Sequence, residues 1–312
     1  MLDIRDVFSN LLELFLLIGV GYGAVRLHML PASASKIFSS LVMNITLPAT
    51  ILTSLVQPYD PAFLNTGLLT IALGFGLYIL YGVISALLVR PCRVSQGRRG
   101  VWIFACTFNN NGFMGFPITL ALFGQEGLVL AVFLGISFNV LSYSTGAKLM
   151  CMDRAAAEGG MQVSWKSILL TVVNGATVLG LVLYAAQLSL PALLKVPLTY
   201  LADITTPVSM LAIGMNLTGG KVSAVFRNRD AFTASLLRLL VLPLLTWGIL
   251  MLLPIHNDLL IGVVLIIMAM PAPAVTSILA ETYGGDTEFA AQVVFLSSLL
   301  CLVTIPLISL LL

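Results

Sequence analysis

Charged residues are scarce in this sequence. Asp, Glu, Lys and Arg make up 9% of the 312 residues, against roughly 25% in soluble globular domains, while hydrophobic residues make up 59%. So little charge excludes a water-soluble fold of this length. The formal net charge is only +2, so we expect no nucleic-acid partner. The composition predicts a protein whose surroundings are a lipid bilayer.

Residues that bind metals or act as nucleophiles are also few. The two histidines, His28 and His256, fall at opposite membrane faces in the topology predicted below, so clustered metal ligands are missing. Two of the four cysteines lie in apolar runs and two lie beside basic loops, which argues against a disulfide framework. No paired aspartates and no Ser–His arrangement occur at membrane depth. We therefore expect no metal, no cofactor, no catalytic residues and no enzymatic activity.

The N-terminus lacks the basic region and the small-residue cleavage site of a signal peptide. It reads MLDIRDVFSN, with Asp3 and Asp6 before the first apolar run. We expect that run to be a retained membrane span.

Apolar runs of about 20 residues are long enough to cross a bilayer as helices. Connections between them are short, and the longest, residues 151–166, leaves no room for another domain. The predicted fold is therefore an all-α polytopic membrane protein with ten transmembrane helices. The ten runs are residues 8–28, 36–56, 63–89, 100–123, 127–150, 167–187, 196–217, 231–253, 259–281 and 288–311.

Basic residues are concentrated in alternate connections. Cytoplasmic loops are enriched in Lys and Arg, so this bias predicts the orientation in the membrane. The opposite side carries only Arg5 and Lys195, and the loop 282–287 is assigned to the cytoplasm by counting alone. We predict the cell membrane (the inner one where there are two) as the location, with both termini outside the cytoplasm. The basic residues on the cytoplasmic side are Arg26, Lys36, Arg90, Arg93, Arg98, Arg99, Lys148, Arg154, Lys166, Lys221, Arg227 and Arg229.

The two halves of the sequence resemble each other weakly. IGVGYGAVRLHMLPA (18–32) resembles VLGLVLYAAQLSLPA (178–192), and NITLPA (44–49) resembles DITTPV (203–208), with offsets of 160 and 159. Each half has five runs, an odd number, so the second half enters the membrane in the opposite sense. We predict two inverted five-helix repeats, residues 1–150 and 167–312, joined by a cytoplasmic linker, residues 151–166.

A polar, helix-breaking segment interrupts the fourth run. It reads FNNNGFMGFP (108–117), and adding 159 to its position reaches AMPAPAVTS (269–277) in the ninth run. Irregular backbone at membrane depth is tolerated only where it is buried in protein or lines a watery cavity. We predict that helices four and nine break near residues 109–116 and 270–275, and that the two breaks cross.

Half-helices that begin at such breaks present unsatisfied N–H groups and a partial positive charge. Two such ends can bind an anion without an arginine, and side-chain amides and hydroxyls can add to the site. The alternative is that the asparagines only satisfy the backbone groups freed by the breaks. The candidate substrate-binding residues are Asn109, Asn110, Asn111, Gly112, Gly115, Pro117, Pro271, Pro273, Thr276 and Ser277.

Other polar residues within the runs are candidates for coupling or support. An acid inside the membrane is a candidate for function, and Asp203 lies in register with Asn44. Arg238 is about two turns from a basic loop, so it either extends back to the interface or serves as a substrate counter-ion. Asn139 is the polar candidate in the fifth run, where a cation/proton antiporter typically has an acidic pair.

The segment NNGFMGFP (110–117) resembles the Asn-x-x-x-Met-Gly-x-Pro motif of the auxin efflux carrier family. The resemblance also rests on Pro48, Pro207 and Pro271 and on the layout of ten runs, and it covers nearly the whole chain. The family includes the plant PIN auxin exporters and bacterial permeases for malate and malonate. The resemblance implies the crossover fold of bile-acid and sodium/proton transporters, organic-anion transport, and Asn110 as the substrate-facing asparagine.

Two departures from the plant members limit what the resemblance implies. Those proteins have a long cytoplasmic loop between the halves and a carboxylate in the third span, whereas here the loop is short and residues 63–89 contain no acid. Plant-like auxin transport and a coupling mechanism are therefore not implied.

We expect a secondary active transporter of small organic anions, carboxylates such as malate, malonate or auxin-like acids, working by alternating access. Two alternatives use the same fold, a cation/proton antiporter and a sodium-coupled organic-anion symporter. The coupling ion, H+ or Na+, and a homodimeric assembly are left open. A membrane receptor or a channel is the alternative from a different class.

Overall fold

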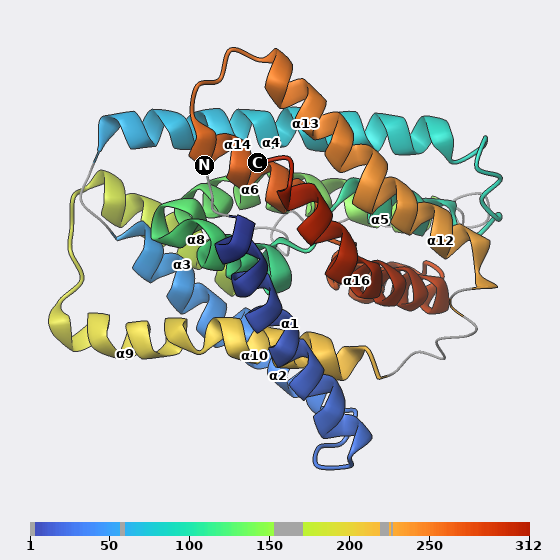
Figure 1. Ribbon diagram of the computed structural model, residues 1–312, viewed down its shortest axis with the longest axis horizontal. Helices are drawn as coiled ribbons and strands as arrows, with labels where there is room; N and C mark the ends of the chain where they lie inside the picture. The colour runs from blue at the N-terminus through green and yellow to red at the C-terminus, as the bar shows by residue number, and fades with distance from the viewer. Residues whose placement is uncertain (1–3, 57–59, 153–170, 219–224, 226) are drawn as a thin grey trace. The chain divides into compact units, whose positions relative to one another are not determined.

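The computed structural model describes residues 4–56, 60–152, 171–218, 225 and 227–312 (Figure 1). Every regular element in these residues is a helix, and they contain no strand, which confirms the all-α prediction. Nearly all of the predicted linker, residues 151–166, and the start of the sixth predicted run lie outside the described residues.

Seven helical stretches of the described residues are long and apolar enough to cross a membrane. Two shorter apolar helices, Val172–Ala185 and Asp258–Met268, lie in the sixth and ninth predicted runs. The chain is thus a polytopic helical protein, while the count of ten spans stays a prediction. The seven stretches are Phe8–Arg26, Ala34–Leu55, Phe63–Leu88, Arg99–Cys151, Ala192–Asn216, Arg229–Leu252 and Thr287–Ser309.

The helices form two compact units, and each unit draws residues from both halves of the sequence. Helices α4 (Pro61–Leu88) and α6 (Phe116–Cys151) contribute to both. Unit 1 also contains α1 (Ile4–Arg26), α2 (Ala34–Leu41), η1 (Val42–Thr46), α3 (Leu47–Leu55), η2 (Asn111–Gly115), α8 (Val172–Ala185), α9 (Ala192–Asp203) and α10 (Thr205–Asn216). Unit 2 also contains α5 (Arg99–Thr107), α12 (Arg229–Leu236), η3 (Leu237–Val241), α13 (Leu242–Leu252), α14 (Asp258–Met268), α15 (Val275–Tyr283) and α16 (Thr287–Ser309).

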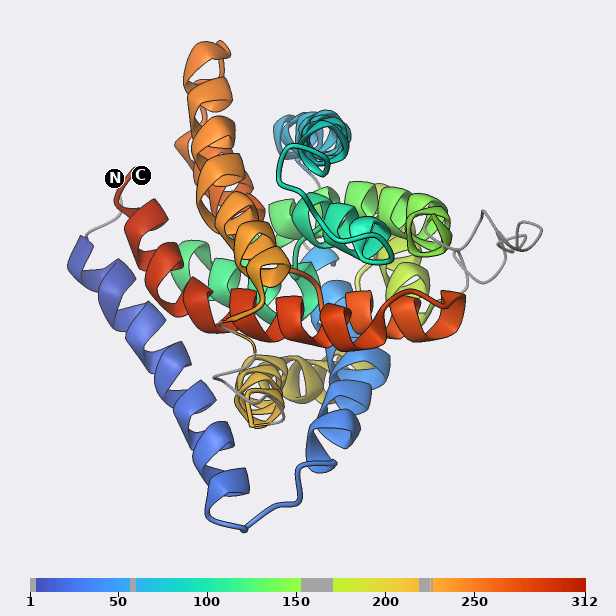
Figure 2. The same cartoon turned by 90° about the vertical axis from the view of Figure 1, so that its right-hand side faces the viewer.

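Three turns of π-helix, η1, η2 and η3, each end two residues before a proline. The prolines are Pro48, Pro117 and Pro243. A proline has no N–H, and its ring clashes with the carbonyl four residues earlier, so the preceding turn widens. Figure 2 shows the result in unit 2, where α12, η3 and α13 continue as one helix through the widened turn.

A glycine with a positive φ divides α6 into two helical segments. Gly124 has φ 66° and ψ −159°, a conformation that side chains disfavour and glycine adopts readily. This residue lies between the fourth and fifth predicted runs, which end at 123 and begin at 127. Gly284, between α15 and α16, also has a positive φ of 75°.

Helices α1 and α10 pack backbone to backbone in unit 1 (Figure 1). A Cβ atom on Gly214 would lie 2.0 Å from the carbonyl oxygen of Ile18, and one on Gly21 would lie 2.3 Å from that of Leu211. Small residues of this kind allow two membrane helices to approach closely.

Helices α1 and α8 end in two separate turns of the same type. His28 and Gln187 both adopt the left-handed conformation, with φ 58° and 56°. Non-glycine residues rarely adopt it outside such turns. The same backbone N–H to carbonyl bonds occur in both turns: His28 to Val25 and Gln187 to Tyr184, at 3.1 Å each, and Met29 to Ala24 and Leu188 to Leu183, at 2.9 Å each.

Candidate functional site

The breaks of two helices lie together in unit 2. Helix α5 ends at Thr107, and the chain is extended at Phe108 before η2 begins at Asn111. Helix α14 ends at Met268, and α15 begins only at Val275. Both predicted interruptions are therefore present. They are also in contact, because the backbone N–H of Asn110 donates to the carbonyl of Pro271 at 2.8 Å.

Both polar atoms of the Asn109 side chain form hydrogen bonds. Pro271 has no N–H, so the carbonyl of Ile267, four residues earlier, lacks its α-helical donor and accepts instead from the backbone N–H of Met270 at 3.1 Å. The Nδ2 group of Asn109 donates to this carbonyl, and its Oδ1 accepts a hydrogen bond of 2.6 Å from the Tyr78 hydroxyl. Asn109 is fully buried, and both ends of its side-chain amide are hydrogen-bonded at the break.

Arg238 lies inside unit 2 and does not extend to an interface. Its side chain is 1% exposed, and its guanidinium carbon lies 5.4 Å from the centre of the Tyr81 ring. Its Nε donates to the carbonyl of Met270 at 3.0 Å, and its Nη1 donates to the carbonyl of Cys106 at 3.4 Å. The interpretation that this residue snorkels back to the basic loop is therefore wrong, because its donors serve the two helix breaks.

Two tyrosines of α4 support the breaks, and the sequence analysis missed both. The hydroxyl of Tyr81 donates to the carbonyl of Leu242 at 2.8 Å and lies 2.6 Å from Oγ1 of Thr246. The Tyr78 ring packs 5.6 Å from that of Phe108, between the ring centres. A buried tyrosine usually finds a partner for its hydroxyl, so two tyrosines three residues apart in an apolar run were the available signal.

The segment between α14 and α15 satisfies much of its own backbone. The hydroxyl of Thr276 donates to the carbonyl of Pro273 at 2.6 Å, and the backbone N–H of Ala272 donates to Oγ of Ser297 at 3.1 Å. Ser277 is partly exposed one position further along α15. Ser297, on α16, was also missed by the sequence analysis.

Several predicted site residues belong to unit 1. Asn111, Gly112 and Gly115 form η2, and Pro117 follows at the start of α6. Within this unit a Cβ atom on Gly112 would lie 3.2 Å from Cδ2 of Leu47, so η2 packs against α3.

The candidates for coupling are less buried. Asn44 is exposed and donates to the carbonyl of Ser40 on its own helix at 3.0 Å. Asp203 is also exposed, at the end of α9. Asn139 is partly buried on α6 in unit 2.

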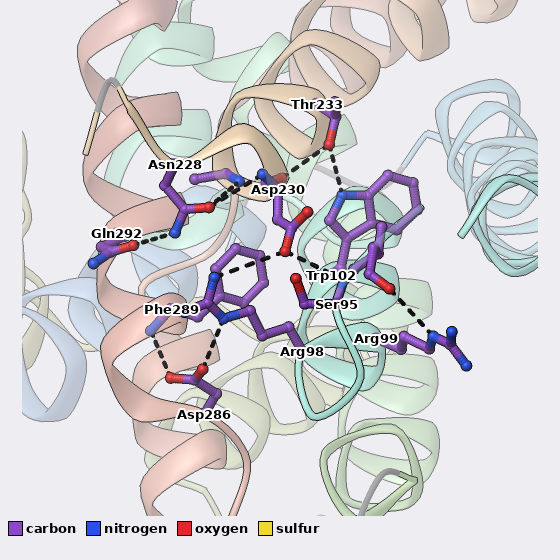
Figure 3. A network of polar contacts seen from close by, with 12 residues as sticks. Ser95, Arg98, Arg99, Trp102, Asn228, Asp230, Thr233, Asp286, Phe289 and Gln292 are labelled. Carbon is purple, nitrogen blue, oxygen red and sulfur yellow. Dashed lines mark hydrogen bonds and ion pairs between the residues drawn. The ribbon is translucent and has the colours of Figure 1, made fainter. Parts of the chain in front are cut away.

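A second polar cluster fixes the beginning of α5 (Figure 3). Nε of Arg98 donates to Oδ2 of Asp286 at 3.0 Å, and its Nη1 lies 3.7 Å from Oδ2 of Asp230. Asp286 caps α16 by accepting from the backbone N–H of Phe289, and Asn228 caps α12 in the same way. Arg98 thereby links the starts of α5, α12 and α16. Helix α5 leads into the break at Asn109, α12 continues into η3, and α16 carries Ser297.

Removing the Tyr78 hydroxyl should destabilise the break at Asn109. In Tyr78→Phe the buried Oδ1 of Asn109 loses its donor, which costs about 1–3 kcal/mol for a buried unsatisfied acceptor. Thermal unfolding of the purified variant measures this effect. Tyr200→Phe, on the exposed surface of α9, is the matched control and should unfold like the parent protein. Equal unfolding temperatures for all three proteins would contradict the assigned role of Tyr78.

Comparison with known proteins identifies the family. A family model described as a membrane transport protein matches residues 6–309. The chain belongs to this family, the auxin efflux carriers. An uncharacterized transporter of Methanothermobacter thermautotrophicus is 26% identical over 299 residues, which cover 96% of each chain. Another, from Methanocaldococcus jannaschii, is 24% identical over 303 residues, 95% of this chain and 96% of the relative.

Family membership confirms the resemblance carried by residues 110–117. The auxin efflux carriers are membrane transporters and not an enzyme family. Combined with the apolar helices, this makes the chain a multi-pass membrane protein that resides in a lipid bilayer and has a transported substrate.

Proposed function

We propose that this auxin efflux carrier is a secondary active transporter of small organic anions, working by alternating access with H+ or Na+ as the coupling ion. The observation that carries the proposal is the pair of helix breaks in unit 2, joined by the hydrogen bond from the Asn110 N–H to the Pro271 carbonyl. Discontinuous helices in secondary transporters form the substrate site near the middle of the membrane. Their exposed backbone groups and partial charges bind the substrate.

The charges around the breaks support an anion as the substrate. The sequence has no acidic residue from 61 to 125 or from 259 to 280, which covers both broken segments. Helix α15 begins at the break, so its N-terminal N–H groups carry a partial positive charge there. A carboxylate fits this environment, whereas a cation would lack a counter-charge. The same scarcity of acids makes a cation/proton antiporter the weaker alternative.

Matching local structures support two inverted repeats, residues 1–150 and 167–312. The left-handed turns at His28 and Gln187 are 159 positions apart, and the glycines with positive φ, Gly124 and Gly284, are 160 apart, with ψ −159° and 28°. These offsets equal the sequence offsets of the repeat motifs. In unit 1, α1 packs on α10 and α8 packs on α3, which are equivalent pairs under the same offset. Two repeats of five spans would give ten spans with both termini on one side of the membrane, and the basic loops predict that this side is outside the cytoplasm.

Within the site, we propose that Asn110 faces the substrate while Asn109 supports the break. Asn111, Gly112, Gly115 and Pro117 would shape the half-helix that follows Asn110. Pro271, Pro273, Thr276 and Ser277 would shape the other half of the site. Asn110 is the position that matches the family motif, and its backbone already joins the two breaks.

Counterflow in proteoliposomes tests the proposal. Vesicles loaded with unlabelled malate, malonate or indole-3-acetate should transiently accumulate the same labelled acid from outside, because a carrier exchanges the two pools. Protein-free vesicles are the control. A channel would equilibrate the label without accumulation, and a receptor would give no uptake, so either result would overturn transport by exchange.

A further inference from the structure

Arg238 is the one buried basic residue among the lysines and arginines that the structure describes. It lies in η3, the π-turn that precedes Pro243. Among the described residues, ion pairs with carboxylates involve Arg98 alone, so Arg238 has no acidic partner there. A buried charge is costly unless other groups compensate it, and the compensating groups here are backbone carbonyls and the Tyr81 ring.

The carbonyls that Arg238 contacts lie at the C-terminal ends of both interrupted helices. In a continuous helix the carbonyl of Cys106 would accept from the N–H of Asn110, but that N–H donates to Pro271 instead. Arg238 supplies the missing donor through Nη1. On the other break, its Nε serves the carbonyl of Met270, two residues past the end of α14. One guanidinium therefore serves both helix ends.

The ends of helices carry about half a unit charge of either sign, negative at the C-terminus. Two negative ends at one place would oppose the binding of an anion. The guanidinium of Arg238 cancels them, so the positive N-terminal end of α15 determines the sign of the potential at the break. In the described part of the chain Nη2 of Arg238 has no hydrogen-bond partner, although it is buried. The cation is thus not neutralised by further acceptors.

We propose that Arg238 is the internal counter-charge of the two breaks, a positioning residue that fixes both helix ends and sets the preference of the site for anions. The role in specificity rests on the proposed function, whereas the role in fixing the helix ends does not. The two parts have separate tests.

Hydrogen exchange followed by mass spectrometry tests the fixing of the helix ends, without a ligand. Arg238→Gln replaces the charged guanidinium by a neutral side chain with a single amide donor group. The backbone N–H groups in peptides covering residues 104–112 and 266–274 should therefore exchange at least about tenfold faster than in the parent protein. Arg238→Lys keeps the charge but lacks the planar fork that serves two carbonyls, so its exchange should rise by a smaller factor. Arg229→Gln, on the exposed surface of α12, is the matched control and should leave both peptides unchanged.

Unchanged exchange in both peptides of Arg238→Gln would overturn the role at the helix ends. If that variant does not fold, Arg238→Lys decides: faster exchange confined to the two peptides supports the proposal, and exchange like that of the parent protein contradicts it.

The preference for anions is tested by the charge dependence of binding. Succinate and succinamate share a carbon frame but carry two negative charges and one. At about 10 Å and an effective dielectric constant of about 20, one positive charge changes affinity by on the order of tenfold per substrate charge. Arg238→Gln should therefore weaken succinate binding about tenfold more than succinamate binding, and Arg238→Lys should keep the ratio of the parent protein.

Equal weakening of both ligands would mean that Arg238 acts on the fold alone, and would overturn the proposed role in specificity. If the parent protein binds neither probe, carboxylate recognition by the site fails, and with it the specificity role. The exchange experiment still decides whether Arg238 fixes the helix ends.

Discussion

Gly214→Ala should greatly destabilise unit 1. The new Cβ atom would lie 2.0 Å from the carbonyl oxygen of Ile18 and 2.8 Å from the backbone nitrogen of Tyr22. Both atoms belong to the backbone of α1, so a rotamer change cannot relieve the overlap and the two helices must separate. We expect a loss of about 3 kcal/mol or more, since overpacking costs typically 1–3 kcal/mol even where side chains can adjust. For a chain of 312 residues that loss lowers the unfolding temperature by roughly 5 °C.

The matched control for this substitution is Gly19→Ala on α1. A Cβ atom there meets no atom within 4 Å, so the variant should unfold at or above the temperature of the parent protein. Thermal unfolding of both variants in the same detergent provides the comparison. If Gly214→Ala unfolded like Gly19→Ala, the close approach of α1 and α10 would not exist in the protein.

Asn110→Ala should weaken anion binding by about ten- to hundredfold. A hydrogen bond to a charged group contributes roughly 1.5–3 kcal/mol, and the proposed site has few donors. Asn110→Asp should weaken binding further, because it places a negative charge where the anion sits. Isothermal titration with the acid that shows counterflow measures the affinity, and melting temperatures of the same samples measure stability.

Asn109→Ala is the matched control for Asn110, because the two asparagines are adjacent but have different roles. The Asn109 side chain is engaged with Tyr78 and Ile267, so its removal should lower the melting temperature and leave the affinity of the folded protein nearly unchanged. If Asn110→Ala behaved in this same way, Asn110 would also be a scaffold residue. The substrate contacts would then have to come from Thr276 and Ser277.

The positions of the helix breaks could be predicted because their causes are local. Asn, Gly and Pro disfavour helix within a few residues, so the segments around Asn110 and Pro271 are visible in an apolar sequence. Gly124 likewise marks the division between two runs by its own conformational freedom. These features depend on the residue and its neighbours alone.

The partners of the breaks could not be predicted, because they come from distant positions in the chain. Tyr78 meets Asn109 from 31 residues away, and Arg238 meets Cys106 from 132 residues away. Sequence pattern gives the type of residue that needs a partner, but not which partner it finds. Asp203 stays a candidate for coupling under the general rule for acids inside a membrane, and the structure places it on the exposed surface at the end of α9.

The π-turns before Pro48, Pro117 and Pro243 have a consequence for the faces of these helices. A π-turn holds one more residue than an α-turn, and each residue of an α-helix advances by about 100° around the axis. The two sides of such a turn are therefore out of phase by about that angle. If residues 229–252 are treated as one uninterrupted α-helix, the side chains after η3 are assigned to the wrong face, with an error of about one residue or 100°. In each of these segments, a single proline determines which side chains of the following helix face the protein and which face the lipid.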